Sequence, residues 1–333
     1  MANRDIVAIG TSAGGVEALI FLAQRVPANF PAAILVTIHL PSGARSGLDQ
    51  ILTRNGALPA SFVPDGEALK LGHIFLAPPG RHLLLDGATL SIGIGPRENN
   101  VRPAIDPMLR SAAVCCGHRS IGVVLTGTQS DGASGLWALR RCGGFTIVQQ
   151  PEDAAFPEMP LAALHRAKPD NVAPLSQMPA LLERLVREPA GEPQPAPASI
   201  KYEVEIARNR MSNMDDMDRI GRRSVLACPD CHGVMWEIDE GDLIRFRCHT
   251  GHAYTAETMD LAIDETLRRA LSSALRALEE RVALLEKLRL QADASGHWQS
   301  AQSWASKKAE FETEAEIVRQ AIRRADAIAA RAA

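Results

Sequence analysis

The chain has 333 residues, of which 46% are hydrophobic and 23% are charged. This length suits about two domains, and the composition is that of an ordinary globular protein. A formal net charge of -3 gives no large electrostatic footprint for nucleic acid, so nucleic acid is excluded as a main partner. No run approaches the roughly 18 apolar residues of a membrane helix, so membrane insertion is not expected. Because no export signal is visible, we expect a cytoplasmic protein whose six cysteines are thiols or metal ligands.

Three short apolar runs each give way to a glycine-containing turn that carries one polar residue with catalytic chemistry. The runs and their polar residues are 6–9 with Ser12, 33–38 with His39, and 121–126 with Asp131. Each run predicts a buried parallel strand. Ligands of an open α/β sheet bind at the carboxyl ends of its strands, so these three side chains are expected to converge.

Strand-like and helix-like patterns alternate from residue 5 to about 187, which predicts a doubly wound, mostly parallel α/β sheet. A first helix is expected over 15–26. Further strands are expected at 73–77 and 144–148. The segments 82–85 and 89–92 flank Asp86-Gly87-Ala88, which predicts an antiparallel hairpin at one edge of that sheet.

A proline- and alanine-rich stretch over 188–197 cannot continue a helix and indicates a domain boundary. Beyond it, two runs of apolar residues repeat at alternating spacings of four and three, which predicts a helical hairpin with its turn at 294–297. The runs are Leu271, Leu275, Leu278, Val282, Leu285 and Phe311, Ala315, Val318, Ile322. The expected division is an α/β domain, a linker with a polar helical stretch, a Cys/His module and a helical hairpin, over 3–187, 188–223, 224–254 and 255–333.

The segment Gly10-Thr11-Ser12-Ala13-Gly14 matches the G-x-S-x-G pattern of a nucleophile elbow. In such a turn the backbone N–H after the serine, here that of Ala13, stabilises the oxyanion of a tetrahedral intermediate. A serine hydroxyl needs a base such as His39, whose tautomer an acid such as Asp131 fixes. These residue types predict a serine hydrolase.

Two other classes remain open on the residues alone. A glycine-rich turn after a first strand also suits a nucleotide-binding module, but the loop lacks a complete G-x-G-x-x-G and a Walker-type lysine. In addition, His39 stands where a dinucleotide site places an acid. Among hydrolases, the order Ser, His, Asp along the chain differs from the Ser, Asp, His order of the α/β-hydrolases, which counts against that superfamily. A non-catalytic signalling or interaction protein with the same fold would be favoured if Ser12 and His39 lay beyond hydrogen-bond reach.

The segments Ile6–Leu19, Ile38–Gly43 and Leu125–Gly135 together resemble the catalytic domain of CheB, the chemotaxis protein-glutamate methylesterase. The resemblance spans residues 3–187 and is supported by Phe75–Gly80 and Val101–Asp106. It implies hydrolysis of methyl esters on receptor glutamates, deamidation of certain receptor glutamines, and no organic cofactor. The implied partner is a methyl-accepting chemoreceptor or a similar methylated signalling protein.

The resemblance carries the nucleophile to Ser12, the base to His39 and the acid to Asp131. Arg102, beside Pro103 in a family-like loop, is a candidate for substrate contact, the alternative being an ordinary surface arginine.

The sequence departs from the family in two ways. It has Gly127-Thr128-Gln129 where the family commonly has Gly-Met-Gly, and Ala13 where the family often has threonine. The backbone donors survive such changes, but the changed side chains are expected to affect the rate and the substrate preference. The chain also begins directly at this domain, without a phosphoacceptor receiver. We therefore expect another mode of control, with the C-terminal helices binding a partner or a second copy in a homo-oligomer.

Four residues in the last third of the chain have the spacing C-x2-C-x16-C-x3-H. They are Cys228, Cys231, Cys248 and His252. This set suits one tetrahedral Zn²⁺, and four protein ligands leave no open position, so the metal is expected to be structural. His249 and His232 are alternative ligands, but a ligand adjacent to Cys248 would strain the chelate, and free thiols are the remaining alternative. The segment is too short to fold on an apolar core alone.

Overall fold

A computed structural model describes residues 3–41, 43, 46–208, 214–240 and 244–332. Ser42 of the family-like motif and residues 209–213 of the predicted polar helical stretch lie outside the described residues. The chain divides into two compact units, Met1–Met259 and Asp260–Ala333. The four-part division expected from the sequence stays a prediction.

The first unit is built on a seven-stranded sheet in which every strand is parallel to its neighbours. In spatial order the strands are β10 (Asn171–Ala173), β9 (Phe145–Gln149), β8 (Ser120–Val124), β1 (Ile6–Thr11), β2 (Ala33–Ile38), β5 (Ile74–Leu76) and β3 (Ala60–Phe62). The chain leaves β1 first toward β2 and later returns on its other side at β8, so the order reverses at β1. Ligand crevices of open α/β sheets form at such a switch point.

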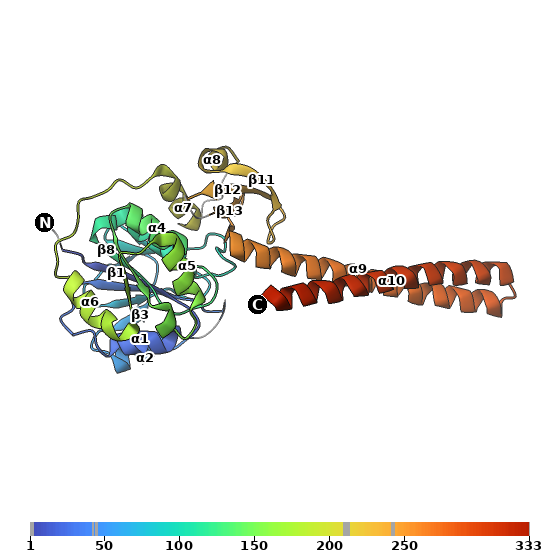
Figure 1. Cartoon of the computed structure of the whole chain (residues 1–333), viewed down its shortest axis with the longest axis horizontal. Helices are drawn as coiled ribbons and strands as arrows, with labels where there is room; N and C mark the ends of the chain where they lie inside the picture. The colour runs from blue at the N-terminus through green and yellow to red at the C-terminus, as the bar shows by residue number, and fades with distance from the viewer. Residues whose placement is uncertain (1–2, 42, 44–45, 209–213, 241–243, 333) are drawn as a thin grey trace. The chain divides into compact units, whose positions relative to one another are not determined.

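Every residue of β1, β2 and β8 is buried, because helices cover both faces of the sheet (Figure 1). Alternate residues point to opposite faces, so Ile6 and Ala8 join one apolar cluster while Val7 and Ile9 join the other. The first cluster includes α3 (Ile105–Cys116), α4 (Ala133–Arg141) and α5 (Glu158–Ala167). The second includes α1 (Gly15–Ala23), α2 (Leu48–Asn55) and α6 (Met178–Leu185). The predicted α/β fold is confirmed.

The hairpin predicted around Asp86-Gly87-Ala88 forms, but it does not extend an edge of the parallel sheet. Strands β6 (His82–Asp86) and β7 (Thr89–Gly93) pair with β4 (Glu67–Ala68) in a separate antiparallel sheet. Leu83 and Leu90 are buried in the same apolar cluster as α3, so the hairpin packs against that helix.

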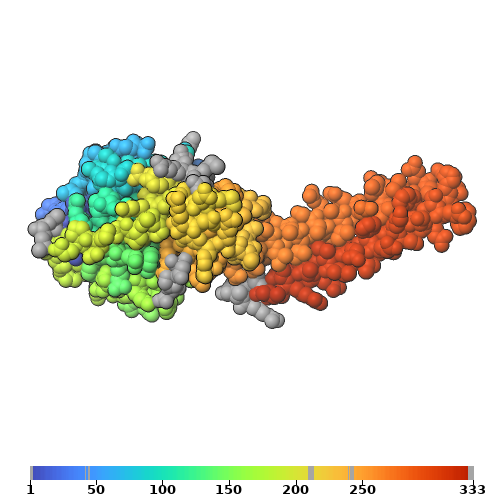
Figure 2. Space-filling view, turned by 90° about the horizontal axis from the view of Figure 1, so that it is seen from above, coloured from blue at the N-terminus to red at the C-terminus, as the bar shows by residue number. Residues whose placement is uncertain are grey.

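After α6 the chain runs through residues 190–197 without helix or strand and enters α7 (Ala198–Arg208) and α8 (Met214–Ile220). A four-stranded antiparallel sheet follows, with its strands in chain order. They are β11 (Arg222–Ala227), β12 (Val234–Asp239), β13 (Ile244–Cys248) and β14 (Ala253–Thr255). In Figure 2 this segment, coloured yellow, lies directly against the green part of the α/β domain.

The predicted C-terminal helices are present as α9 (Ala256–Ala294) and α10 (Trp298–Ala332). Gly296 lies in the turn between them with φ of 71°, a conformation that glycine adopts without strain. Ion pairs join the two helices, such as Arg319 to Glu279 at 2.8 Å and Lys308 to Glu286 at 3.1 Å. Within the described residues, no helix is both long and apolar enough to cross a membrane.

Candidate active site

Ser12, His39 and Asp131 meet at the carboxyl ends of three adjacent strands. Ser12 follows β1, His39 follows β2, and Asp131 lies in the loop between β8 and α4. Ser12 Oγ lies 3.0 Å from His39 Nδ1, and His39 Nε2 lies 2.8 Å from Asp131 Oδ2. The structure therefore brings together all three residues that the sequence analysis chose.

The hydrogen bonds fix how the imidazole is used. Because the Asp131 carboxylate accepts the Nε2 proton of His39, Nδ1 is left as the acceptor for the Ser12 hydroxyl. The His39 side chain is 15% exposed and the Asp131 side chain is 1% exposed. His39 is thus accessible from solvent while Asp131 is sealed from water.

Asp131 is held by the start of α3. Its carboxylate accepts the backbone N–H of Ile105 at 2.7 Å and that of Asp106 at 3.2 Å. These are two of the N–H groups that a helix N-terminus leaves without an intrahelical partner. Burial alone would raise the pKa of Asp131, but hydrogen bonding and charge from His39, the Ile105 N–H and the Asn99 amide lower it below its ordinary value. Asp131 is therefore held as a carboxylate.

Two further residues of the site, Asn99 and Asp106, were not chosen from the sequence. Asn99 Nδ2 donates to Asp131 Oδ1 at 3.0 Å and to Asp106 Oδ2 at 3.1 Å. Asp106 Oδ1 accepts the N–H of Gly132 at 3.0 Å and that of Gly135 at 2.6 Å. Burial, followed by the charge of Asp131, raises the pKa of Asp106 to about 7. The motif Val101–Asp106 was the only sequence signal near this pair.

Glycines allow the close approach of the loops that carry the three residues. Gly14 adopts φ of 73° at the start of α1, directly after the serine turn. A Cβ on Gly127 would lie 2.2 Å from Met159 Sδ and 2.8 Å from Ser12 Cβ, so no larger residue fits there. Gln129 also has a left-handed backbone, with φ of 66°, although it is not glycine.

A cavity of about 370 Å³ opens beside His39. It is lined by His39, Leu40, Pro41, Arg97, Asn100, Val101 and Arg102. Arg102 Nη1 donates to the carbonyl oxygens of Ile94 at 2.9 Å and Gly95 at 2.7 Å, which holds this side chain at the cavity wall. Ala13, the predicted oxyanion donor, lies in the turn after Ser12, and its carbonyl accepts the hydroxyl of Thr126 at 3.0 Å.

The four predicted metal ligands also come together. The ligand atoms of Cys228, Cys231, Cys248 and His252 lie within 4.8 Å of one another. Cys231 Sγ lies 3.7 Å from Cys248 Sγ, and Cys248 Sγ lies 3.4 Å from His252 Nδ1. A tetrahedral ion with metal–sulfur bonds of about 2.3 Å needs sulfur–sulfur edges of roughly 3.8 Å. The cluster fits a metal ion of that geometry, and His249 is not part of it.

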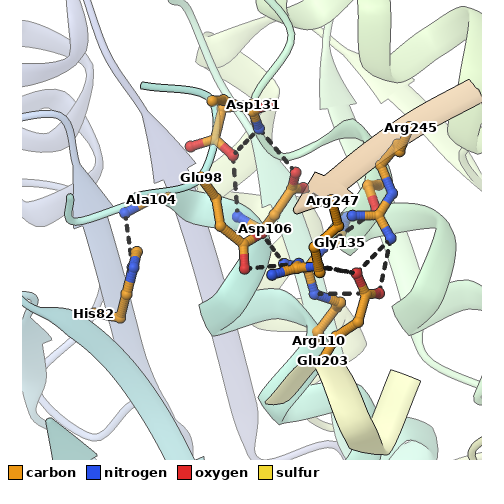
Figure 3. A network of polar contacts seen from close by, with 12 residues as sticks. His82, Glu98, Ala104, Asp106, Arg110, Asp131, Gly135, Glu203, Arg245 and Arg247 are labelled. Atoms are coloured by element: carbon orange, nitrogen blue, oxygen red, sulfur yellow. Dashed lines mark hydrogen bonds and ion pairs between the residues drawn. The ribbon is translucent and has the colours of Figure 1, made fainter. Parts of the chain in front are cut away.

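A buried group of ion pairs joins the β11–β14 sheet to the α/β domain (Figure 3). Arg247 on β13 binds Glu98 at 2.9 Å and Glu203 of α7 at 2.8 Å. Arg245 binds Glu203 at 2.7 Å, and Arg110 of α3 binds Glu98. All five side chains are at most 2% exposed. Such charges are stable in an interior only because each one is paired.

A hydroxyl, an imidazole and a carboxylate in hydrogen-bonded series at the ends of parallel strands define an α/β protein with a serine-hydrolase arrangement. A family model described as CheB methylesterase matches residues 7–182, which is more than half of the chain. The chain belongs to the CheB methylesterase family.

Individual relatives agree with this assignment. A protein-glutamate methylesterase/protein-glutamine glutaminase 2 of Anaeromyxobacter dehalogenans is 35% identical over 186 residues, covering 56% of this chain and 54% of that protein. A protein-glutamate methylesterase/protein-glutamine glutaminase 3 of Myxococcus xanthus is 38% identical over 181 residues, covering 54% and 51%. The crystal structure of the Thermotoga maritima CheB methylesterase catalytic domain matches with a TM-score of 0.53 and 32% identity. It covers 56% of this chain and 100% of that one. The chain spans about half the length of the curated relatives it matches.

Proposed function

We propose that this protein is a cytoplasmic protein-glutamate methylesterase, with glutamine deamidase activity, that acts on a methyl-accepting chemoreceptor or a similar methylated signalling protein. The observation that carries the proposal is the series Ser12, His39 and Asp131, joined by contacts of 3.0 Å and 2.8 Å. The 3.0 Å contact between serine and imidazole counts against a non-catalytic protein. The names of the relatives support the choice of reaction.

In the proposed reaction Ser12 Oγ attacks the ester carbonyl while His39 Nδ1 takes the hydroxyl proton. Asp131 keeps its negative charge and stabilises the imidazolium that forms. The Ala13 N–H donates to the oxyanion. His39 then returns the proton to the leaving oxygen, methanol departs, and a water molecule activated by His39 hydrolyses the acyl-enzyme to release the glutamate carboxylate. A glutamine substrate follows the same course and releases ammonia.

The cavity beside His39 is the proposed binding place for the esterified side chain. Arg97 is exposed at this cavity and Arg102 forms part of its wall, so both place positive charge near the substrate. Positive charge favours an acidic segment, which a receptor region rich in glutamate supplies. Arg102 is therefore proposed as a substrate contact through its remaining guanidinium donors. In that case Arg102→Gln raises KM toward a receptor substrate more than it lowers kcat.

Methanol release from a methylated chemoreceptor tests the proposed activity. We expect the wild type to release methanol and Ser12→Ala to release none above background. A second Ser–His pair provides the control, because Ser61 Oγ lies 2.9 Å from His73 Nε2 at the edge of the sheet, away from the three strand ends. Ser61→Ala is expected to keep full activity. Equal methanol release by wild type and Ser12→Ala would overturn the proposed function.

The Cys228, Cys231, Cys248 and His252 cluster is proposed to hold one structural Zn²⁺. Three thiolates and one imidazole are ligands that zinc prefers, and a closed set of four leaves no place for a substrate. Elemental analysis of protein purified without added metal is expected to give about one zinc per chain. Cys231→Ser should lose it, whereas Cys142→Ser, a buried cysteine outside the cluster, should keep it. Full zinc content in Cys231→Ser would contradict the ligand set.

The helical hairpin is proposed to pair with a second copy of itself. A cavity of about 470 Å³ between α9 and α10 is lined by apolar residues that include Leu267 and Ile317, which are 48% and 55% exposed. Asp264 and Arg324 line the same cavity with opposite charges. A twofold axis that pairs Asp264 of one copy with Arg324 of the other forms this ion pair twice. Light scattering is expected to show a dimer. Ile317→Glu should give a monomer, while Val225→Glu, at an exposed site outside the hairpin, should not; a monomeric wild type would refute the pairing.

A further inference from the structure

The side chain of Asn99 is 2% exposed and connects the triad acid to the segment that follows the Cys/His cluster. On one side its Nδ2 donates to the carboxylates of Asp131 and Asp106. On the other side its Oδ1 accepts the backbone N–H of Thr255 at 3.1 Å and the hydroxyl of Thr258 at 3.2 Å, a hydroxyl that also lies 3.1 Å from the Thr255 carbonyl oxygen. Every hydrogen-bonding atom of this amide is therefore occupied.

The contacts from the C-terminal side determine which way the amide points. A backbone N–H can only donate, so Thr255 must face the oxygen of Asn99. The NH₂ group is then left to face the side-chain oxygens of Asp131 and Asp106, of which the ionised Asp131 can only accept. A reversed amide would place its oxygen against Asp131 and leave the Thr255 N–H without an acceptor. Thr255 and Thr258 thus select the orientation of Asn99 that supports Asp131.

A second connection reaches the same loop independently. The hydroxyl of Thr255 lies 2.7 Å from that of Ser130, the residue immediately before Asp131. The backbone N–H of Asn99 donates to the Ala253 carbonyl at 2.8 Å, and the N–H of Ala253 donates to the Arg97 carbonyl at 3.3 Å. Strand β14 therefore runs beside the loop that carries Asn99 and contacts the loop that carries the acid.

The position of β14 is in turn set by the rest of the β11–β14 sheet, to which the Cys/His cluster belongs. It begins directly after the ligand His252 and pairs with β13, which ends at the ligand Cys248. Thr255 also accepts the N–H of Thr258 at 3.3 Å through its side chain, as an N-cap residue of α9 does. Both threonines are at most 2% exposed. Strand β14 is thus held by its pairing with β13 and by the first turn of α9, independently of its contacts with Asn99.

We propose that Asn99 is a positioning residue for Asp131, and that Thr255 and Thr258 hold it in place, so that β14 of the β11–β14 sheet and the start of α9 help to position the triad. The inference rests on the proposed esterase function. Loss of the Nδ2 donor leaves Oδ1 of Asp131 with only the backbone N–H groups of Asp106 and Gly132, and it removes the amide that bridges the side chains of Asp131 and Asp106. Asp131 then turns from His39, and misplacement of this kind costs about 10- to 100-fold in rate.

Matched substitutions at Thr258 test the proposal without removing a buried amide. The substrate is a synthetic peptide that carries a glutamate γ-methyl ester. We expect Thr258→Val, which keeps the shape and removes the hydroxyl, to lower kcat at least fivefold with KM unchanged. Thr258→Ser keeps the hydroxyl and should restore kcat to within twofold of the wild type. Thr266→Val, which removes a hydroxyl that donates within α9 to the Ala262 carbonyl, should have no effect.

A double-mutant cycle asks whether both residues act through one path. Asn99→Leu is expected to lower kcat by 10- to 100-fold, and adding Thr258→Val to it should lower kcat no further. A residue that only supported folding would reduce the fraction of active protein, so kcat per titrated active site would stay constant. Additive losses, or Thr258→Val with the kcat of the wild type, would refute the proposal.

A spectroscopic measurement separates this proposal from the esterase function. In ¹⁵N-histidine-labelled protein, the His39 Nε2 proton bound to Asp131 should give a downfield resonance that disappears in Asp131→Ala. It should shift or broaden in Thr258→Val and persist in Thr258→Ser. An unchanged resonance in Thr258→Val refutes the positioning role even if the peptide is not hydrolysed. If the resonance changes in Thr258→Val while the wild type does not hydrolyse the peptide, only the proposed substrate is refuted.

Discussion

The α/β domain and the β11–β14 sheet are stabilised in different ways within one compact unit. In the domain, the strands β1, β2 and β8 are buried along their whole length between two large apolar clusters. The β11–β14 sheet has a small apolar cluster that includes Trp236 of β12 and Met217 of α8. Its other buried contacts include the Cys/His cluster and the paired charges of Arg245 and Arg247. A small sheet with few apolar residues needs such specific interactions to fold.

The comparison matters for function because the site draws on both regions. Ser12 and His39 depend on strand ends of the apolar domain, and their positions follow from the parallel sheet. Asp131 is held by the start of α3 on one side and, through Asn99, by β14 and α9 on the other. Ser12 and His39, the proposed nucleophile and base, therefore belong to the domain with the large apolar core, while Asp131 also depends on the region held by the Cys/His cluster and by buried ion pairs.

The largest effect is expected within the apolar domain. If Ser12 and His39 act as one unit, Ser12→Ala, His39→Ala and the double variant should each lose about the same activity, at least 10⁴-fold in kcat. Asp131→Asn should lose less, because its role is orientation. Steady-state methanol release from a methylated receptor measures all four variants. Losses that multiply in the double variant would show that the two residues do not form a common unit.

The next effect tests the charges that attach the β11–β14 sheet. Glu203 is 1% exposed and contacts Arg110, Arg245 and Arg247. Glu203→Leu leaves these buried arginines with too few acceptors, and breaking a buried pair costs about 3–5 kcal/mol in the free energy of unfolding. Urea denaturation measures this loss. Glu205→Leu, whose carboxylate on the same helix is 40% exposed, should cost under about 1 kcal/mol. Equal losses of unfolding free energy in the two variants would mean that the buried ion pairs stabilise the fold no more than an exposed carboxylate does.

A pH-dependent effect is expected at Asp106, which shares the amide of Asn99 with Asp131. The pKa of this carboxyl is raised from 3.8 to about 7, so the folded state keeps a proton that the unfolded chain has released. This contribution to stability is complete below about pH 4 and is lost as pH rises to about 7. The stability of the wild type relative to Asp106→Asn should therefore fall across that range, by up to about 4 kcal/mol.

Chemical denaturation of both proteins at several pH values measures the difference. Comparison of the two cancels other groups that titrate in the same range, such as His82, whose pKa burial lowers. The difference should level off above about pH 8. A difference that stays constant from pH 4 to pH 8 would show that the carboxyl ionises normally in the folded protein.

Local patterns in the sequence were sufficient to predict the parallel sheet and the residues at its strand ends. Continuous apolar runs before Ser12, His39 and Asp131 indicate buried parallel strands, and parallel strands bring their carboxyl ends to one edge. The spacing of the four Cys and His residues predicted a cluster in the same way, because a turn and a hairpin place such ligands together. These features depend on short segments whose chemistry is visible in the sequence.

The remaining parts depend on contacts between distant segments. Arg247 meets Glu98 across 149 positions of the chain, and Thr258 meets Asn99 across 159. Neither the charged pair Arg247 and Glu98 nor the amide of Asn99 has neighbours in the sequence that indicate these distant partners. The hairpin at 82–93 was placed at a sheet edge for the same reason, since its local pattern predicts a turn but not the helix against which it packs. Asn99 itself was not chosen from the sequence, because no short pattern around it indicates its partners.

The smallest effect concerns Gln129, one of the positions at which the sequence departs from the Gly-Met-Gly of the family. Its φ of 66° costs a side-chain-bearing residue about 1–2 kcal/mol, while a glycine costs about 0.5–1 kcal/mol through the entropy of the unfolded chain. Gln129→Gly should therefore stabilise the protein by about 0.5 kcal/mol. Gln150→Gly, at a residue with an ordinary φ of -56°, should destabilise it by a similar amount. In thermal denaturation, the midpoint should rise in Gln129→Gly and fall in Gln150→Gly. Destabilisation by Gln129→Gly would mean that the glutamine side chain itself supports the acid loop, and the departure from the family would then be a functional one.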